Sequence, residues 1–87
     1  MTDSEINLAI AKIEYPNEPD RNLTEHNYCT NWSDIGPIIE REGLALMTCR
    51  DGMYQASKWV GSLLETAYGD TPTKAAALLY LKMKGET

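Results

Sequence analysis

The sequence predicts a single α+β domain spanning residues 1–87, in which helices pack on a small antiparallel sheet. Three observations predict this fold: an amphipathic segment with a capping signal at the start, two extended segments around Asp51-Gly52, and a run of strong helix formers after Thr71-Pro72. Hydrophobic residues make up 43% of the chain and charged residues 24%. That composition is typical of a globular protein rather than a disordered one.

The first segment predicts a helix over residues 3–13. Thr2 and Glu5 match a capping box, in which each residue satisfies a backbone N–H of the other. Apolar residues follow at helical spacing, at Ile6, Ala9, Ile10 and Ile13. Pro16 ends the helix, and the Pro-, Asn- and acid-rich residues 14–27 predict a loop that buries little apolar area.

A short helix is expected over residues 34–42. Ser33 or Asp34 is a suitable N-cap, and Gly43 fits the left-handed position after the last turn. Pro37 is accepted only in a first turn, so we expect the regular helix to begin shortly before it.

A β-hairpin is the clearest pattern in the chain, with strands expected over residues 44–49 and 53–59. Asp51-Gly52 suits a two-residue type I′ turn, because both turn residues need a positive φ. Such a turn sets the register and places Met47 opposite Ala56.

In that register each side of the hairpin carries apolar residues. One face holds Ala45, Met47, Cys49, Tyr54, Ala56 and Lys58. The other holds Leu44, Leu46, Thr48, Gln55, Ser57 and Trp59. We therefore expect either that helices partly cover both faces or that one face bears an exposed apolar patch.

The rest of the chain predicts a further strand and a closing helix. Residues 64–68 favour a third antiparallel strand over a short helical piece. A helix is predicted over residues 72–84, because Thr71 can cap it and Pro72 suits the first helical position. Its broad apolar face is expected to dock across the sheet. The first helix is expected to pack on the sheet too, with the Pro37 helix at one edge.

Charge and composition argue against several classes of function. Thirteen acidic and eight basic residues give a net charge of −5, and the bases are scattered, so direct nucleic-acid binding is not expected. The acidic first residues and the lack of a long apolar run predict a cytoplasmic protein that contacts no membrane. In that compartment Cys29 and Cys49 are expected to be free thiols.

No motif of the sequence predicts a catalytic residue, a cofactor or a metal ion. His26 and Cys29 lie three apart, but a zinc site needs more ligands than they and Cys49 supply. We interpret Cys29 and Cys49 as small buried residues and His26 as a loop residue. A small hydrolase or ligand-binding site that uses His26, Cys29 and Asp34 is the alternative.

Four apolar residues form a candidate interface: Trp32, Leu44, Leu46 and Trp59. Trp32 precedes the second helix, where a hydrophobic staple against Pro37 is the simplest interpretation and a surface anchor the alternative. Trp59 lies beside Leu44 and Leu46 in the predicted register, so joint exposure of these three would indicate an interface.

The segment Tyr28-Cys29-Thr30-Asn31-Trp32-Ser33-Asp34-Ile35-Gly36-Pro37-Ile38-Ile39 resembles the NinX-like family of small phage and prophage proteins. The run from Thr71 to Leu81, which begins Thr-Pro-Thr-Lys-Ala-Ala, resembles the last motif of that family. The order of elements is also similar to the phage α-β-α sandwich domain. The resemblance implies a phage or prophage gene expressed in a bacterial cytoplasm, and it implies no catalytic residue.

These observations together predict a non-enzymatic accessory protein that acts through contacts with a host or phage protein. A homodimer through a free strand edge or an apolar sheet face is a further expectation. A third hypothesis is an acidic DNA mimic, although the acidic residues are spread along the chain with only a mild concentration over residues 14–25.

Overall fold

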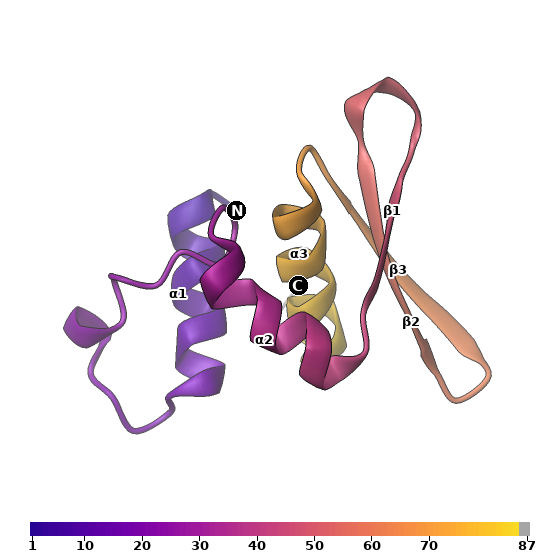
Figure 1. Cartoon of the computed structure of the whole chain (residues 1–87). Coiled ribbons are helices and arrows are strands. Elements are labelled where there is room, and N and C mark those ends of the chain that lie inside the picture. Colours follow the sequence, from indigo (N-terminus) through magenta and orange to yellow (C-terminus); the bar gives the residue numbers. More distant parts are fainter. Residues whose placement is uncertain (86–87) are drawn as a thin grey trace.

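The computed structural model describes residues 1–85 and confirms the α+β fold (Figure 1). The helices are α1 (Asp3–Glu14), α2 (Trp32–Glu42) and α3 (Pro72–Met83). The strands are β1 (Ala45–Thr48), β2 (Tyr54–Val60) and β3 (Leu63–Gly69). Short 3₁₀ turns cover Asp20–Asn22 and Arg50–Gly52. The third strand, expected over residues 64–68, is therefore confirmed.

The elements form layers with α3 in the middle. The sheet has the order β1-β2-β3, and both strand pairs are antiparallel. Helix α3 packs on one face of all three strands, and α1 and α2 pack mainly on α3 rather than on the sheet (Figure 1). The helical layer therefore reaches the sheet chiefly through α3. No helix of residues 1–85 is long and apolar enough to cross a membrane.

Helix α3 supplies more buried residues to the core than any other element. Its fully buried side chains are Ala75, Ala76, Ala77, Leu79, Tyr80 and Leu81. The alanines allow close approach to the sheet: a Cβ atom on Gly69 would lie 2.7 Å from the backbone nitrogen of Ala75. A side chain at residue 69 would thus push β3 away from α3.

The capping signals at the starts of α1 and α3 are confirmed. The Thr2 hydroxyl accepts from the backbone N–H of Glu5 at 3.2 Å, and the Glu5 carboxylate accepts from that of Thr2 at 2.9 Å. The Thr71 hydroxyl accepts from the Lys74 N–H at 3.2 Å, with Pro72 in the first turn of α3. These residues satisfy backbone donors that a helix start leaves unpaired.

Helix α2 begins earlier than predicted. Its N-cap is Asn31, whose side chain accepts from the Ser33 N–H at 2.9 Å, so the prediction of a Ser33 or Asp34 cap is wrong. Pro37 consequently lies inside the helix rather than in its first turn. Gly36 helps to explain how the helix continues, because a residue without a Cβ avoids the clash that disfavours helical backbone before proline.

The register of the first hairpin differs from the prediction by one residue. Asp51 and Gly52 have positive φ angles of 61° and 72°, as expected. However, the Cys49 N–H donates to the Met53 carbonyl at 2.8 Å, which closes a three-residue loop instead of a two-residue turn. Ala56 therefore pairs with Leu46 rather than with Met47. Because side chains alternate along a strand, the shift exchanges the faces of β1 relative to β2.

A polar network joins the three helices at the end of α1. The Arg41 guanidinium binds both carboxylate oxygens of Glu14 at 2.9 Å, and the Tyr80 hydroxyl donates to the same carboxylate at 2.5 Å. The hydrogen bonds from Arg41 hold the pKa of Glu14 below its usual range. The network thus fixes α1 and α2 against the middle helix.

Candidate interaction face

The sheet has one face away from α3, and we call it the open face. Opposed residues of paired strands share a face, so the register assigns its eight positions. They are Ala45, Met47, Gln55, Ser57, Trp59, Leu64, Thr66 and Tyr68. None of the eight is charged, although 24% of the whole chain is. The open face is thus a neutral surface on a protein of net charge −5.

Four large side chains of the open face are about half exposed or more. The exposed fractions are 65% for Trp59, 57% for Met47, 52% for Tyr68 and 47% for Leu64. Trp59 lies opposite Leu64, while Met47 and Tyr68 flank Gln55 on its two sides. The Gln55 amide donates to the Tyr68 hydroxyl at 3.0 Å, so these two polar groups of the open face bind each other.

These four side chains lie on one face in two groups, Trp59 with Leu64 and, beyond Ser57, Met47 and Tyr68 on either side of Gln55. Large apolar side chains gathered on one exposed face of a monomer often mark an interaction site. Trp, Tyr and Met are enriched and charged residues depleted at the centres of protein interfaces. The composition of the open face matches that pattern.

The structure does not bring the four predicted interface residues together. Trp59 lies on the open face, but Leu44 is buried and Leu46 points toward the α3 side of the sheet. Trp32 is 54% exposed in the first turn of α2. It follows the N-cap instead of preceding it, so the predicted hydrophobic staple against Pro37 is wrong.

Sequence reasoning missed Met47, Leu64 and Tyr68 as members of this surface. The one-residue error in register assigned Met47 to the same face as Ala56, which is fully buried. Leu64 and Tyr68 belong to a segment whose partner strand the sequence does not specify. The alternation of Leu64, Thr66 and Tyr68 is the signal that identifies a shared face once β3 is assigned.

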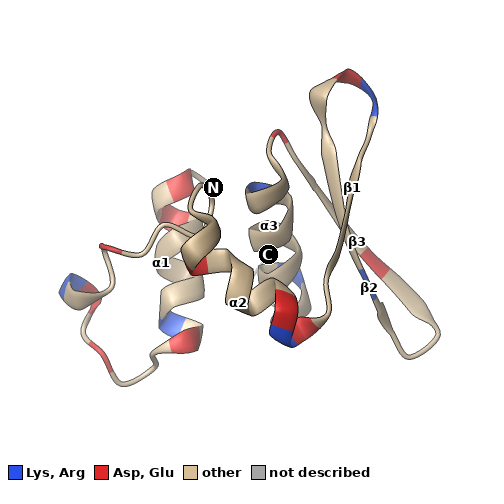
Figure 2. Cartoon of the chain, in the orientation of Figure 1, with Lys and Arg blue, Asp and Glu red and all other residues tan. Residues whose placement is uncertain are grey.

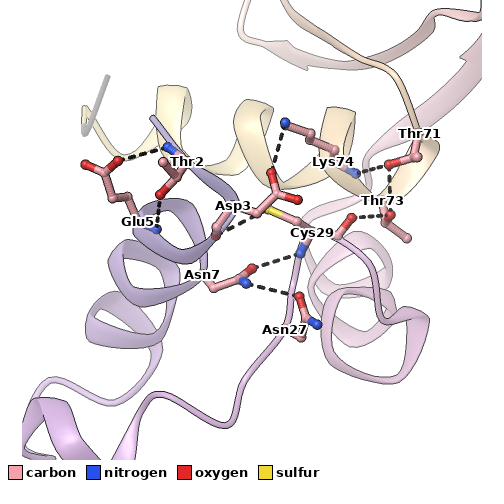
Figure 3. Close-up of polar contacts among 9 residues, drawn as sticks. All are labelled: Thr2, Asp3, Glu5, Asn7, Asn27, Cys29, Thr71, Thr73 and Lys74. Atoms are coloured by element: carbon pink, nitrogen blue, oxygen red, sulfur yellow. Dashed lines mark hydrogen bonds and ion pairs between the residues drawn. The ribbon is translucent and has the colours of Figure 1, made fainter.

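Cys29 occupies a structural position rather than a reactive one (Figure 3). It is fully buried, its thiol faces the Asp3 carbonyl at 3.8 Å, and its N–H donates to the Asn7 side chain at 3.0 Å. Its carbonyl accepts from the Thr73 hydroxyl at 2.6 Å. Burial raises the pKa of the Cys29 thiol to about 11, whereas a nucleophilic cysteine needs a lowered pKa.

The other two residues of the alternative site are held in separate contacts. The His26 ring stacks between Tyr15 and Tyr28, with ring centroids 5.1 and 5.7 Å away. The Asp34 carboxylate accepts from the Asn27 N–H at 2.8 Å. Ring packing therefore explains the position of His26, and loop closure explains that of Asp34.

Within the described residues, charged and metal-binding side chains do not gather into a further candidate site. Both cysteines are free, and residues 1–85 contain no group of three or more His, Cys, Asp and Glu side chains that could hold a metal ion. Figure 2 shows acidic residues on α1, on the following loop, at the end of α2 and on β3. Several form ion pairs: Asp3 with Lys74, Glu14 with Arg41, Asp20 with Lys12, Glu42 with Lys58, and Glu65 with Lys82.

No family model, curated protein or solved structure matches this chain. The resemblance to the NinX-like family therefore remains a prediction from the residues that carry it.

Proposed function

We propose that this chain is a non-enzymatic accessory protein that binds another protein through the open face. The observation that carries the proposal is that none of the eight positions is charged and that four of them, Met47, Trp59, Leu64 and Tyr68, hold large exposed side chains. Exposed apolar area is unfavourable in water by roughly 25 cal/mol per Å². A partner that covers Trp59 and its neighbours removes that cost, which gives the face a driving force for association.

The chemistry of the open face favours a protein as the partner. Binding to a nucleic-acid backbone depends on Lys and Arg that neutralise phosphates, and the face offers neither. The surrounding protein is acidic, so a partner with a basic rim around an apolar patch would be attracted to it before contact. By resemblance to the NinX-like family, the partner we propose is a host or phage protein of a bacterial cytoplasm.

The two alternative hypotheses lack a comparable supporting observation. The thiol of Cys29 is buried with a raised pKa, which does not favour nucleophilic chemistry. A DNA mimic requires carboxylates aligned on one surface, while those of Asp3, Glu14 and Glu65 are engaged in ion pairs on different elements.

Two adjacent leucines provide a matched test of the proposal. Leu64 lies on the open face and Leu63 on the opposite face, and both are well exposed. The immobilised wild type is used to capture proteins from a bacterial lysate, in parallel with Leu64→Ser, Trp59→Ala and Leu63→Ser. We expect a captured protein that Leu64→Ser and Trp59→Ala lose and Leu63→Ser retains. Capture that is equal for all four chains, or absent for all four, contradicts the proposal.

A further inference from the structure

We propose that the partner binds as an extended strand along the free edge of β1 and inserts an apolar side chain into a pocket beside that edge. The inference rests on the proposed function, because it names the form in which a protein partner docks. A strand added to β1 would widen the sheet, so its alternate side chains would extend the open face next to Met47.

The register identifies the free backbone groups of β1. In an antiparallel pair, residues alternate between pairs that exchange hydrogen bonds and pairs that do not. The bond from the Cys49 N–H to the Met53 carbonyl sets this alternation, so the N–H and C=O groups of Leu46 and Thr48 point away from β2. No hydrogen bond links these groups to another element within residues 1–85. They present the pattern that an incoming strand needs.

The opposite edge of the sheet differs in this respect. The β3 carbonyl of Thr66 accepts from the Lys82 ammonium group at 3.1 Å. Lys82 also forms an ion pair with Glu65 at 3.4 Å. A charged side chain over the centre of an edge strand is a common protection against strand addition. The chain therefore protects β3 in a way that it does not protect β1.

A shallow pocket, open to solvent, lies beside the free edge. It has a volume of about 260 Å³ and is lined by Trp32, Leu46, Met47, Thr48, Tyr54 and Pro72. None of these residues is charged, which favours an apolar occupant. The volume is below the roughly 300–1,000 Å³ of sites for small molecules, so one side chain of a peptide suits it better. Trp32, 54% exposed in the first turn of α2, forms one wall.

An open edge next to a side-chain pocket is the arrangement by which peptides bind through strand addition. The main-chain hydrogen bonds provide affinity, and the pocket selects one residue of the peptide. A second copy of this chain is a weaker candidate, because two chains of net charge −5 repel each other. The occupant we infer is an extended segment of another protein with an apolar residue at its centre.

Two random decapeptide libraries test the inference on the whole chain. The libraries differ only at the fifth position, which is leucine in one and aspartate in the other. We expect the leucine library alone to yield ligands. In NMR spectra of the ¹⁵N-labelled protein, a selected ligand should shift the Leu46 and Thr48 amide signals and slow their hydrogen exchange by at least about tenfold. The amides of Leu64 and Tyr68, on the other edge, should change little.

Substitutions at Thr48 separate strand addition from other modes of binding. Thr48→Pro removes an outward N–H without loss of a hydrogen bond to β2, and it should weaken peptide binding at least about tenfold. Thr48→Val keeps the N–H and should bind like the wild type. Trp32→Ala opens the pocket and should weaken the preference for leucine. Unchanged spectra around Ala56 establish that each variant is folded.

Three results would overturn the inference. One is that neither library yields a ligand. Another is a ligand that shifts Trp59 and Leu64 and binds Thr48→Pro normally, which would keep the open face as the docking surface and reject the β1 edge. The last is a dimer of the chain alone with protected Leu46 and Thr48 amides, which would assign the edge to a second copy.

Discussion

Leu64 lies directly opposite Trp59 in the β2–β3 ladder, and both side chains project from the face that α3 does not cover. Cross-strand pairs of this kind contribute about 0.2–1 kcal/mol to a sheet. On the other face of the same ladder, Ala56 lies opposite Ala67 and is fully buried under the helical layer. The sheet thus separates a packed core from a surface whose apolar area folding leaves exposed.

Removal of the Trp59 side chain should change binding far more than stability. Trp59→Ala should lower the free energy of unfolding by less than about 1 kcal/mol, because the ring is mostly exposed. Leu79→Ala, in the fully buried part of α3, should lower it by about 2–5 kcal/mol. Urea denaturation of the two variants measures the difference. Comparable losses would show that Trp59 belongs to the core.

Gly69 should not tolerate a side chain. A Cβ at this position would lie 2.7 Å from the backbone nitrogen of Ala75, and no change of rotamer can move a backbone atom. Gly69→Ala should therefore lower the free energy of unfolding by about 1–3 kcal/mol, as overpacking does elsewhere. A thermal melt compared with that of the wild type measures it, and an unchanged midpoint would mean that α3 does not approach β3 this closely.

The chain should lose stability in acid through Glu14. The guanidinium of Arg41 lowers the pKa of this carboxylate in the folded state from an ordinary value of 4.5. A lowered pKa stabilises the fold above the unfolded-state pKa, and the contribution disappears as pH falls through the folded-state pKa. We therefore expect the stability that this group contributes at neutral pH to be lost progressively as the pH falls below 4.5.

Glu14→Gln tests whether Glu14 causes this loss of stability in acid. It removes the titrating group, so the difference in urea midpoint between neutral and acidic pH should become smaller than in the wild type. Glu40→Gln changes an exposed residue on α2 and serves as the matched control. If both variants keep the wild-type pH dependence, the Glu14–Arg41 pair does not contribute to acid unfolding.

The two cysteines should differ in reactivity. Cys29 is fully buried and burial raises its thiol pKa to about 11, so iodoacetamide should not modify it in the native protein at neutral pH. Cys49 is partly exposed after β1 and should be modified. Peptide mass mapping distinguishes the sites, and denaturation should make both reactive. Rapid native labelling of Cys29 would instead support the alternative nucleophile.

Several local features of the fold follow from neighbouring residues and were predicted, although the N-cap of α2 was not. Thr2 and Glu5 cap α1 because the reciprocal hydrogen bonds need only a spacing of three. Asp51 and Gly52 adopt positive φ because few other residues accept it. The sequence did not determine how many residues the loop contains, since Asp-Gly is compatible with both a two-residue and a three-residue connection.

Two features that depend on distant residues were not predicted. The carboxylate of Glu14 meets Arg41 and Tyr80 from two other helices, and no local pattern links them. The open face depends in the same way on pairing between strands. One residue of register decides whether Met47 or Leu46 shares a face with Trp59, and it therefore decides which residues form the proposed surface.

The make-up of the open face depends most directly on the register of β1 against β2, and NMR can measure that register. The Cα atoms of pairs without mutual hydrogen bonds lie about 4.5 Å apart in antiparallel sheets, close enough for a strong NOE between their α-protons. We predict such NOEs between Leu46 and Ala56 and between Thr48 and Tyr54. An NOE between the α-protons of Met47 and Ala56 would contradict the account, because it would turn Met47 toward α3 and Leu46 toward Trp59.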